Sequence, residues 1–265
     1  MAMMDLVDVT IHYEEAGSGS SAYIFCHGLG AEGMEFVDEF PFWQEHFGRV
    51  VAWENRGRGQ SSSAAKYSLP LFASDLARLM DGLGIEKAVI HGVSWGGVVV
   101  QQFALDYLEK CLAVVIDSSS SEVNAAGSEN WYKIGEVGRL GASAAGAFQP
   151  AFAGHTSSAS ARAETRVTIA QEHVDYYVAA ARSVASLREQ PFTPRLKNIT
   201  CPALVVAGGK DEVAGAGGSV IMSRNLPNSK LEIFQDAGHG VHHQDPEGYR
   251  ALVLEFCRQN GILKS

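Results

Sequence analysis

The chain has 265 residues, of which 21 are Lys or Arg and 30 are Asp or Glu, so its formal net charge is −9. This acidic balance argues against a nucleic-acid binder, which needs a basic surface, and against docking on anionic lipid. Apolar residues make up 46% of the chain, enough for one substantial core, and no apolar run approaches the ~18 residues that a membrane helix needs.

Short apolar runs alternate along the chain with longer amphipathic stretches. The first segment, Val7–Tyr13, alternates as a half-exposed strand does. Continuous apolar runs follow, and they are typical of strands buried on both faces of a mainly parallel sheet: Tyr23–Cys26, Val50–Trp53, Ala88–Ile90, Ala113–Ile116, Ala203–Val206 and Leu231–Phe234. Helical spacing or a helix start signal predicts helices between and after them: Leu71–Leu83, Gly97–Tyr107 and Pro246–Cys257. This alternation predicts an α/β fold with helices on both faces of the sheet.

One region interrupts the alternation of strands and helices. From Ser118 to about Pro191 there is no strand-like run. An insertion of about 70 residues between two strands predicts a mostly helical cap rather than a loop. The stretch Gly138–Ala163, rich in Ala, Gly and Ser, could instead be a flexible linker. Helical spacing over Arg162–Leu187 favours the cap.

A candidate nucleophile follows the run Ala88–Ile90. Gly92-Val-Ser94-Trp-Gly96 matches G-x-S-x-G, in which a serine is held in a strained turn between a strand and a helix. Small residues are needed around it because a Cβ would collide across the tight turn. The pattern is weak alone, but the strand before it and the helix after it are the context that this chemistry requires. Ser94 is therefore the predicted nucleophile.

A second pattern, His27-Gly28-Leu29-Gly30, follows the strand Tyr23–Cys26. Acyl transfer develops an oxyanion that backbone N–H groups can stabilise, and glycines allow the backbone to approach closely. The N–H groups of Leu29 and Trp95 are the predicted donors. The alternative is an ordinary turn at the end of a strand. We expect His27, Gly28 and the cap residue Trp131 to contact the substrate.

A histidine and an acid are needed to activate a serine. His239 lies just after the run Leu231–Phe234 and shortly before the last helix, a position that favours it over His242 and His243. Asp211 follows the preceding strand, so the chain order is Ser, Asp, His. Asp117 is the rival acid, after Ala113–Ile116, and Glu212 is a weaker candidate.

Taken together, these motifs resemble those of the α/β-hydrolase superfamily. Five motifs occur in the order that the superfamily has: 27–30, Glu54–Ser61, 92–97, 208–211 and 238–239. The second resembles the superfamily's D-x-R-G-x-G-x-S turn, with Glu54 where Asp is usual, a departure that concerns a structural turn. The resemblance implies a mainly parallel, eight-stranded sheet flanked by helices. It also implies a core of residues 1–120 and 191–265 and a helical cap, 121–190, inserted after the sixth strand.

Three functional hypotheses fit this resemblance. The first is a serine hydrolase that cleaves carboxylic esters or lactones of small, largely apolar substrates through an acyl-enzyme. The second is a C–C bond hydrolase of ring-cleavage products, which typically has a polar or cationic group that faces the substrate carboxylate. Four cap arginines could serve, although solvation at the surface explains them equally well: Arg139, Arg162, Arg166 and Arg182. The third is a ligand receptor without catalysis. A serine at the elbow excludes the haloalkane dehalogenases and epoxide hydrolases of this fold, which attack with an aspartate.

The remaining expectations concern cofactors, partners and location. The four cysteines are far apart and have no metal-ligand spacing, so we expect neither a metal nor an organic cofactor. The acidic start, Met1–Asp8, does not have the character of a signal peptide. We expect a soluble cytoplasmic monomer or homodimer whose partner is a small-molecule substrate.

Overall fold

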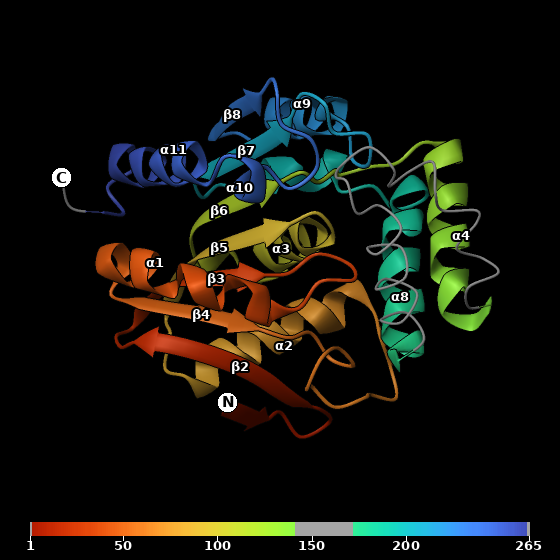
Figure 1. Cartoon of the computed structure of the whole chain (residues 1–265), viewed down its shortest axis with the longest axis horizontal. Coiled ribbons are helices and arrows are strands. Elements are labelled where there is room, and N and C mark those ends of the chain that lie inside the picture. The colour runs from red at the N-terminus through yellow and green to blue at the C-terminus, as the bar shows by residue number, and fades with distance from the viewer. Residues whose placement is uncertain (1, 141–171, 264–265) are drawn as a thin grey trace.

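The computed structural model describes residues 2–140 and 172–263, and its centre is one eight-stranded sheet (Figure 1). The strand order is β1-β2-β4-β3-β5-β6-β7-β8. Strand β2 is antiparallel to β1 and β4, and the other neighbouring pairs are parallel. The strands are β1 (Ala2–Asp5), β2 (Thr10–Gly17), β3 (Ser21–Cys26), β4 (Arg49–Trp53), β5 (Lys87–Val93), β6 (Cys111–Asp117), β7 (Ala203–Gly208) and β8 (Ser229–Phe234). The predicted mainly parallel eight-stranded sheet is therefore confirmed.

Side chains of the central strands enter two separate cores, one on each face of the sheet. Along β3, Ile24 and Cys26 join one cluster, while Tyr23 and Phe25 join the other. Successive side chains of a strand point to opposite faces, so a strand covered on both sides needs apolar residues at every position. This explains why the central strands appear in the sequence as continuous apolar runs.

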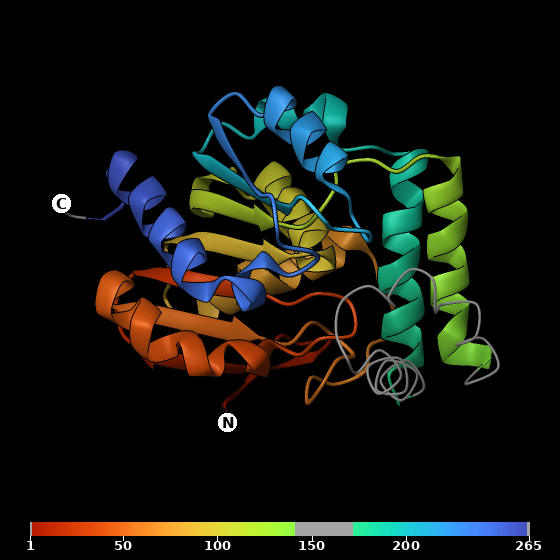
Figure 2. The same cartoon turned by 45° about the horizontal axis from the view of Figure 1, so that its top comes forward.

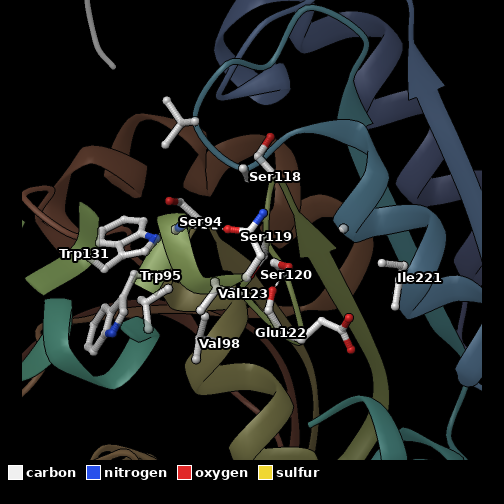
Figure 3. Close-up of a pocket in the computed structure, with 16 residues that line it drawn as sticks. Ser94, Trp95, Val98, Ser118, Ser119, Ser120, Glu122, Val123, Trp131 and Ile221 are labelled. Carbon is white, nitrogen blue, oxygen red and sulfur yellow. Dashed lines mark hydrogen bonds between the residues drawn. The ribbon is translucent and has the colours of Figure 1, made fainter. Parts of the chain in front are cut away.

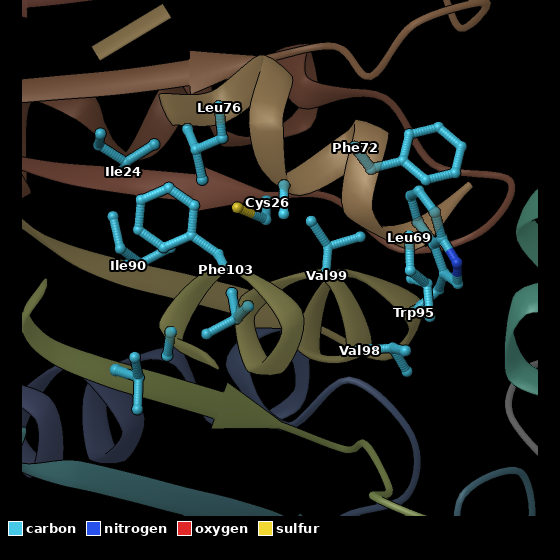
Figure 4. Packing of buried hydrophobic residues seen from close by; sticks show 14 of the residues in the cluster. Ile24, Cys26, Leu69, Phe72, Leu76, Ile90, Trp95, Val98, Val99 and Phe103 are labelled. Atoms are coloured by element: carbon cyan, nitrogen blue, oxygen red, sulfur yellow. The ribbon is translucent and has the colours of Figure 1, made fainter. Parts of the chain in front are cut away.

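Helices cover both faces of this sheet (Figures 1 and 2). Residues of α2, α3 and α9 belong to the first cluster, and those of α1 and α11 to the second. Figure 4 shows Phe72 of α2 and Phe103 of α3 within the first. The helices outside the insertion are η1 (Gly33–Glu39), α1 (Phe40–Phe47), α2 (Leu69–Gly82), α3 (Trp95–Asp106), η2 (Leu108–Lys110), η4 (Thr193–Asn198), α9 (Ala216–Asn225), α10 (Val241–Gln244) and α11 (Pro246–Gln259).

The start of the chain differs from its prediction. Instead of one strand over Val7–Tyr13, two short antiparallel strands, β1 and β2, are joined by a turn. Val7 lies in that turn with φ 75°, and it is 98% exposed. The turn is closed by hydrogen bonds from Leu6 N to Val9 O (2.8 Å) and from Val7 N to the Asp5 carboxylate (2.8 Å). The alternation of Val7 with Val9 and Ile11 therefore did not indicate a continuous strand.

The chain between β6 and β7 carries two long helices that lie side by side (Figures 1 and 2). They are α4 (Ala125–Leu140) and α8 (Val174–Ala185), and η3 (Ser186–Arg188) follows them. Both helices fall in the range predicted for a helical cap, 121–190. Most of the Ala-, Gly- and Ser-rich stretch lies outside the described residues.

The parallel strands bring their carboxyl ends to one edge of the sheet, where open α/β sheets bind ligands. Ser94 follows β5 and Asp117 ends β6. Asp211 comes shortly after β7, and His239 comes shortly after β8. Residues more than 140 positions apart in the sequence therefore meet at this edge. No helix in the described part of the chain is long and apolar enough to cross a membrane.

Candidate active site

Ser94 is held in a strained turn between β5 and α3. Its backbone has φ 55° and ψ −117°, in the positive-φ region that side chains other than glycine rarely adopt. Its N–H donates to the main-chain oxygen of Asp117 (2.8 Å), and its carbonyl accepts from Gly97 N (2.9 Å). Strain of this kind persists only where the surroundings enforce it. The side chain is partly exposed at the N-terminus of α3, where the helix dipole favours negative charge.

Two glycines make the turn at Ser94 possible. A Cβ on Gly92 would lie 2.4 Å from the carbonyl oxygen of Gly96. A Cβ on Gly96 would lie 2.2 Å from the carbonyl oxygen of Cys26, at the end of β3. Both distances are far below any normal contact, so only glycine fits at either position. The G-x-S-x-G spacing is thus a packing requirement of this edge of the sheet.

The partly exposed His239 and the buried Asp211 form a hydrogen-bonded pair near Ser94. His239 Nδ1 lies 2.9 Å from Asp211 Oδ2, and Asp211 Oδ1 accepts from the N–H groups of Val213 (2.8 Å) and Ala214 (3.0 Å). Burial opposes ionisation of Asp211, but the hydrogen bond and charge of His239 and the two N–H groups outweigh it and lower its pKa. An ionised carboxylate only accepts, so Nδ1 of His239 carries the proton and Nε2 is left as a base.

The rival acid, Asp117, pairs with a different histidine. Asp117 Oδ2 lies 2.9 Å from His242 Nδ1, and Asp117 Oδ1 accepts from the Ser118 hydroxyl (2.8 Å). Burial opposes ionisation of Asp117 as well, but His242, His91 and Ser118 together lower its pKa. The site therefore contains two Asp–His pairs, and sequence reasoning did not anticipate the second.

His27 does not occupy the position expected for a substrate contact. It is fully buried, and Nδ1 donates to Gly28 O (2.9 Å) while Nε2 accepts from Asn55 N (3.3 Å) and Asn55 Nδ2 (3.0 Å). Burial lowers its pKa to about 4, so the ring is neutral at physiological pH. Its geometry fixes the loop that carries Gly28 and Leu29 rather than a ligand, which corrects the predicted role.

The backbone donors predicted for an oxyanion come from the chain segments that follow β3 and β5. Leu29 follows β3 and Trp95 begins α3. Neither N–H donates a hydrogen bond to another residue in the described part of the chain. The Arg58 side chain steadies the loop of Leu29 by donating to Ala31 O (2.9 Å). Both N–H groups therefore remain available to a ligand.

Ser94 lies in the wall of two cavities. The first, which we call the histidine cavity, has a volume of about 310 Å³ and contains both Ser94 and His239 in its lining. Its other lining residues include Gly28, Leu29, Glu35, Trp131, Tyr177, His242 and His243. The second, which we call the serine cavity, has a volume of about 360 Å³ and is shown in Figure 3. Its lining includes Trp95, Val98, Ser118–Ser120, Glu122, Val123, Trp131, Val184, Val213 and Ile221.

Two tryptophans connect the site to the inserted helices. Trp131 of α4 lines both cavities, as expected for a residue that contacts the substrate. Trp95 is 1% exposed, and its indole N–H donates to the Ser183 hydroxyl of α8 (2.9 Å). The helix that follows Ser94 is therefore bonded directly to the inserted helix α8.

One further positioning residue, Gln244, gave no sequence signal. Its Oε1 accepts from Gly238 N (2.9 Å), and its Nε2 donates to His239 O (3.2 Å), so its side chain closes the loop that presents His239.

Glu54, which replaces the usual aspartate, accepts from Gln60 N (2.6 Å) and His12 Nδ1 (2.9 Å). Glu54 therefore closes the turn of residues 54–61, for which the sequence predicted a structural role.

No three His, Cys, Asp or Glu side chains are grouped to hold a metal ion in the described ranges 2–140 and 172–263. The four cysteines are unpaired thiols. Of the arginines suggested to bind a substrate carboxylate, Arg182 pairs with Glu136 (2.9 Å), and Arg139 lies 3.7 Å from the same carboxylate. Neither lines the two cavities at Ser94. Arg162 and Arg166 lie outside the described residues.

Comparison with known proteins agrees with this fold. The chain is 25% identical over 238 residues to the carbamate hydrolase RutD of Escherichia coli O7:K1, covering 87% of this chain and 89% of the relative. It is 24% identical over 255 residues to 3-oxoadipate enol-lactonase 2 of Acinetobacter baylyi, covering 93% and 92%. The crystal structure of the enol-lactonase from Burkholderia xenovorans LB400 superposes with a TM-score of 0.82 at 19% identity, over 97% of this chain and 100% of that chain. A family model described as the alpha/beta hydrolase family matches residues 23–252, so the chain belongs to this family.

Proposed function

We propose that this member of the family is a serine hydrolase that cleaves carboxylic esters or lactones of small, largely apolar substrates. One observation carries the proposal: Ser94, in its strained turn, shares the lining of one cavity with His239, whose Nδ1 is bonded to the buried Asp211. A nucleophile, a base and a group that orients the base are the elements of nucleophilic acyl transfer. The names of the relatives, an enol-lactonase and a carbamate hydrolase, support hydrolysis at an acyl carbon.

In the proposed mechanism, Nε2 of His239 removes the proton from the Ser94 hydroxyl, which attacks the ester or lactone carbonyl. The N–H groups of Leu29 and Trp95 stabilise the oxyanion of the tetrahedral intermediate. Collapse of this intermediate breaks the acyl–oxygen bond, and His239 gives its proton to the leaving alcohol. Water, deprotonated by His239, then attacks the acyl-enzyme. The bond between the acyl carbon and the Ser94 oxygen breaks, His239 returns its proton to that oxygen, and the acid is released.

Asp211 supports both steps because its carboxylate stabilises the imidazolium that forms on His239. The two cavities that Ser94 lines, of about 310 and 360 Å³, match small acyl and alcohol groups. Trp131 gives both cavities an apolar wall, and Trp95 adds to that of the serine cavity. C–C hydrolysis is less well supported, because Arg139 and Arg182 pair with a cap carboxylate away from both cavities.

The proposal is tested by hydrolysis of p-nitrophenyl esters with acyl chains of two to twelve carbons, comparing the wild type with Ser94→Ala. We expect turnover by the wild type, with an optimum at short chains because of the cavity sizes, and its loss in the variant. Thermal unfolding of both proteins checks that they are folded. A folded wild type without turnover would contradict ester hydrolysis and direct attention to C–C cleavage or ligand sensing.

A further inference from the structure

Four consecutive serines, 118–121, follow β6 at the edge of the sheet where Ser94 lies. Three of their hydroxyls have hydrogen-bond partners within the protein: the Asp117 carboxylate for Ser118 (2.8 Å), the Glu122 carbonyl for Ser120 (2.7 Å) and the Thr193 hydroxyl for Ser121 (2.7 Å). The hydroxyl of Ser119 is buried and has no partner in the described part of the chain. Ser119 therefore differs from its neighbours in having an unused hydrogen-bonding group.

The Ser119 side chain is fixed in position by close packing. The residue is 3% exposed, and its hydroxyl lies over the first turn of α3. A Cβ on Gly97 would lie 2.6 Å from Ser119 Cβ and 2.7 Å from Ser119 Oγ, so the glycine makes the room that this serine occupies. A buried hydroxyl without a hydrogen bond is unfavourable. A ligand that supplies the missing hydrogen bond to this rigidly held hydroxyl therefore binds more favourably.

Ser119 also lines the serine cavity, which has two chemically different sides. Figure 3 shows the Trp131 ring on one side of Ser94 and Ser119 on the other. Val98 and Val123 extend the apolar lining. The lining also has polar residues, namely Ser118, Ser120, Glu122 and Asn124. The hydroxyls of Ser118 and Ser120 already have hydrogen-bond partners, so Ser119 carries the lining hydroxyl that a ligand oxygen can bond without displacing a contact within the described part of the chain.

We propose that Ser119 is a specificity-determining residue, whose hydroxyl binds an oxygen carried on the acyl chain of the substrate. This inference rests on the proposed ester or lactone hydrolysis at Ser94 and names the substrate class: acyl groups with a hydroxyl, ether or keto oxygen. The apolar side of the cavity holds the carbon chain, and Ser119 bonds the oxygen. Plain alkanoyl esters bind in the same cavity but leave the Ser119 hydroxyl without a partner.

The experiment compares two p-nitrophenyl esters that differ at one atom, the butanoate and the methoxyacetate, in which one CH₂ is replaced by an ether oxygen. The 3-hydroxybutanoate is a third substrate with a hydroxyl. The ratio of kcat/KM for an oxygenated ester to kcat/KM for the butanoate is measured in the wild type and in Ser119→Ala. Intrinsic differences in ester reactivity cancel when these two ratios are compared.

We expect Ser119→Ala to lower this ratio by about 10-fold for at least one oxygenated ester, as the loss of one hydrogen bond does. Ser119→Cys keeps the packing over Gly97 but donates and accepts weakly, so its ratio should fall in the same direction. Ser219→Ala is the matched control. Ser219 is also buried with an unpartnered hydroxyl in the described part of the chain, but it does not line the serine cavity, so its ratio should not change.

The possible results separate this inference from the proposed function. If the wild type hydrolyses the esters and both Ser119 variants keep the wild-type ratios, the role of Ser119 is overturned and ester hydrolysis stands. If Ser219→Ala lowers the ratio as much as Ser119→Ala, the effect is a general loss of packing and the role is also overturned. If a folded wild type hydrolyses none of the esters, the proposed function fails, and this inference fails with it.

Discussion

The two Asp–His pairs provide the sharpest test of the proposed mechanism, because the same substitution should act differently on each. Asp211 bonds His239 at 2.9 Å, and Asp117 bonds His242 at the same distance. Both aspartates are buried and both have lowered pKa values. We predict that Asp211→Asn abolishes most of the activity and that Asp117→Asn does not.

The expected magnitude for Asp211→Asn follows from the partners of each carboxylate oxygen. Oδ1 accepts from two main-chain N–H groups, those of Val213 and Ala214, and only the oxygen of an asparagine can replace it. The asparagine NH₂ group must then face His239 Nδ1, and because it only donates, the proton of the imidazole moves to Nε2. An imidazole protonated at Nε2 cannot accept the proton of Ser94. Such a tautomer change lowers kcat by about 10⁴-fold, or about 5 kcal/mol in the activation free energy.

Asparagine at position 117 meets different partners. Its oxygen can accept from His242 while its NH₂ group donates to Ser118, whose hydroxyl can turn and become the acceptor. The N–H of Ser94 is bonded to the main-chain oxygen of Asp117, which the substitution does not alter. We therefore expect kcat to remain within about 10-fold of the wild type and the free energy of unfolding to fall by about 1–3 kcal/mol.

Both variants are assayed with the best p-nitrophenyl ester across the pH range in which the enzyme is folded. Urea titration of each variant separates loss of stability from loss of catalysis. Equal falls in kcat for the two variants, with both folded, would refute the assignment of Asp211 to the catalytic histidine. A fall confined to Asp117→Asn would transfer the role to the second pair.

Three further predictions concern stability. Gly96→Ala should cost about 3 kcal/mol or more in the free energy of unfolding, because its Cβ would lie 2.2 Å from Cys26 O. Gly217→Ala in α9 meets nothing within 4 Å and should raise that free energy by up to about 1 kcal/mol, as urea titration would measure. Burial lowers the pKa of His91 to about 3 in the folded protein, so the unfolded chain binds a proton between about pH 6.5 and pH 3 and the folded chain does not. The free energy of unfolding should thus fall as the pH drops, by about 2 kcal/mol from His91 between pH 6.5 and 5. His91→Gln should flatten this pH dependence, and an unchanged slope would refute the contribution of His91.

The fold was largely predictable because its determinants are local in the sequence. Residues such as Val89 and Ile90 are apolar in succession because β5 is covered on both faces, and that requirement is visible without coordinates. The turn at Ser94 was predictable because its glycines stand close together in the sequence: Gly92 and Gly96 are required by their close approach to the carbonyl oxygens of Gly96 and Cys26. The prediction of one strand over Val7–Tyr13 was wrong because a turn with positive φ at Val7 breaks an otherwise regular alternation of apolar and polar residues.

The pairing of side chains within the site was less accessible. Whether Asp117 contacts His239 or His242 depends on the path of the chain after β8. The two histidines are only three positions apart, so the sequence alone does not distinguish them as partners of Asp117. His27 was expected to contact the substrate, but Asn55 on another loop holds it in the interior. Such partners lie far away in the sequence and leave no periodic signal.

The end of β6 connects the parts of the site more closely than any other segment. The main-chain oxygen of Asp117 bonds the N–H of Ser94, its carboxylate bonds His242 in the loop after His239, and two residues later Ser119 lines the serine cavity. The first of these contacts uses the backbone, which a side-chain substitution does not remove. The others use side chains that a substitution can change singly. In the proposed mechanism, catalysis at Ser94 and selection of the acyl group at Ser119 can therefore vary independently, although both depend on residues at the end of β6 and just after it.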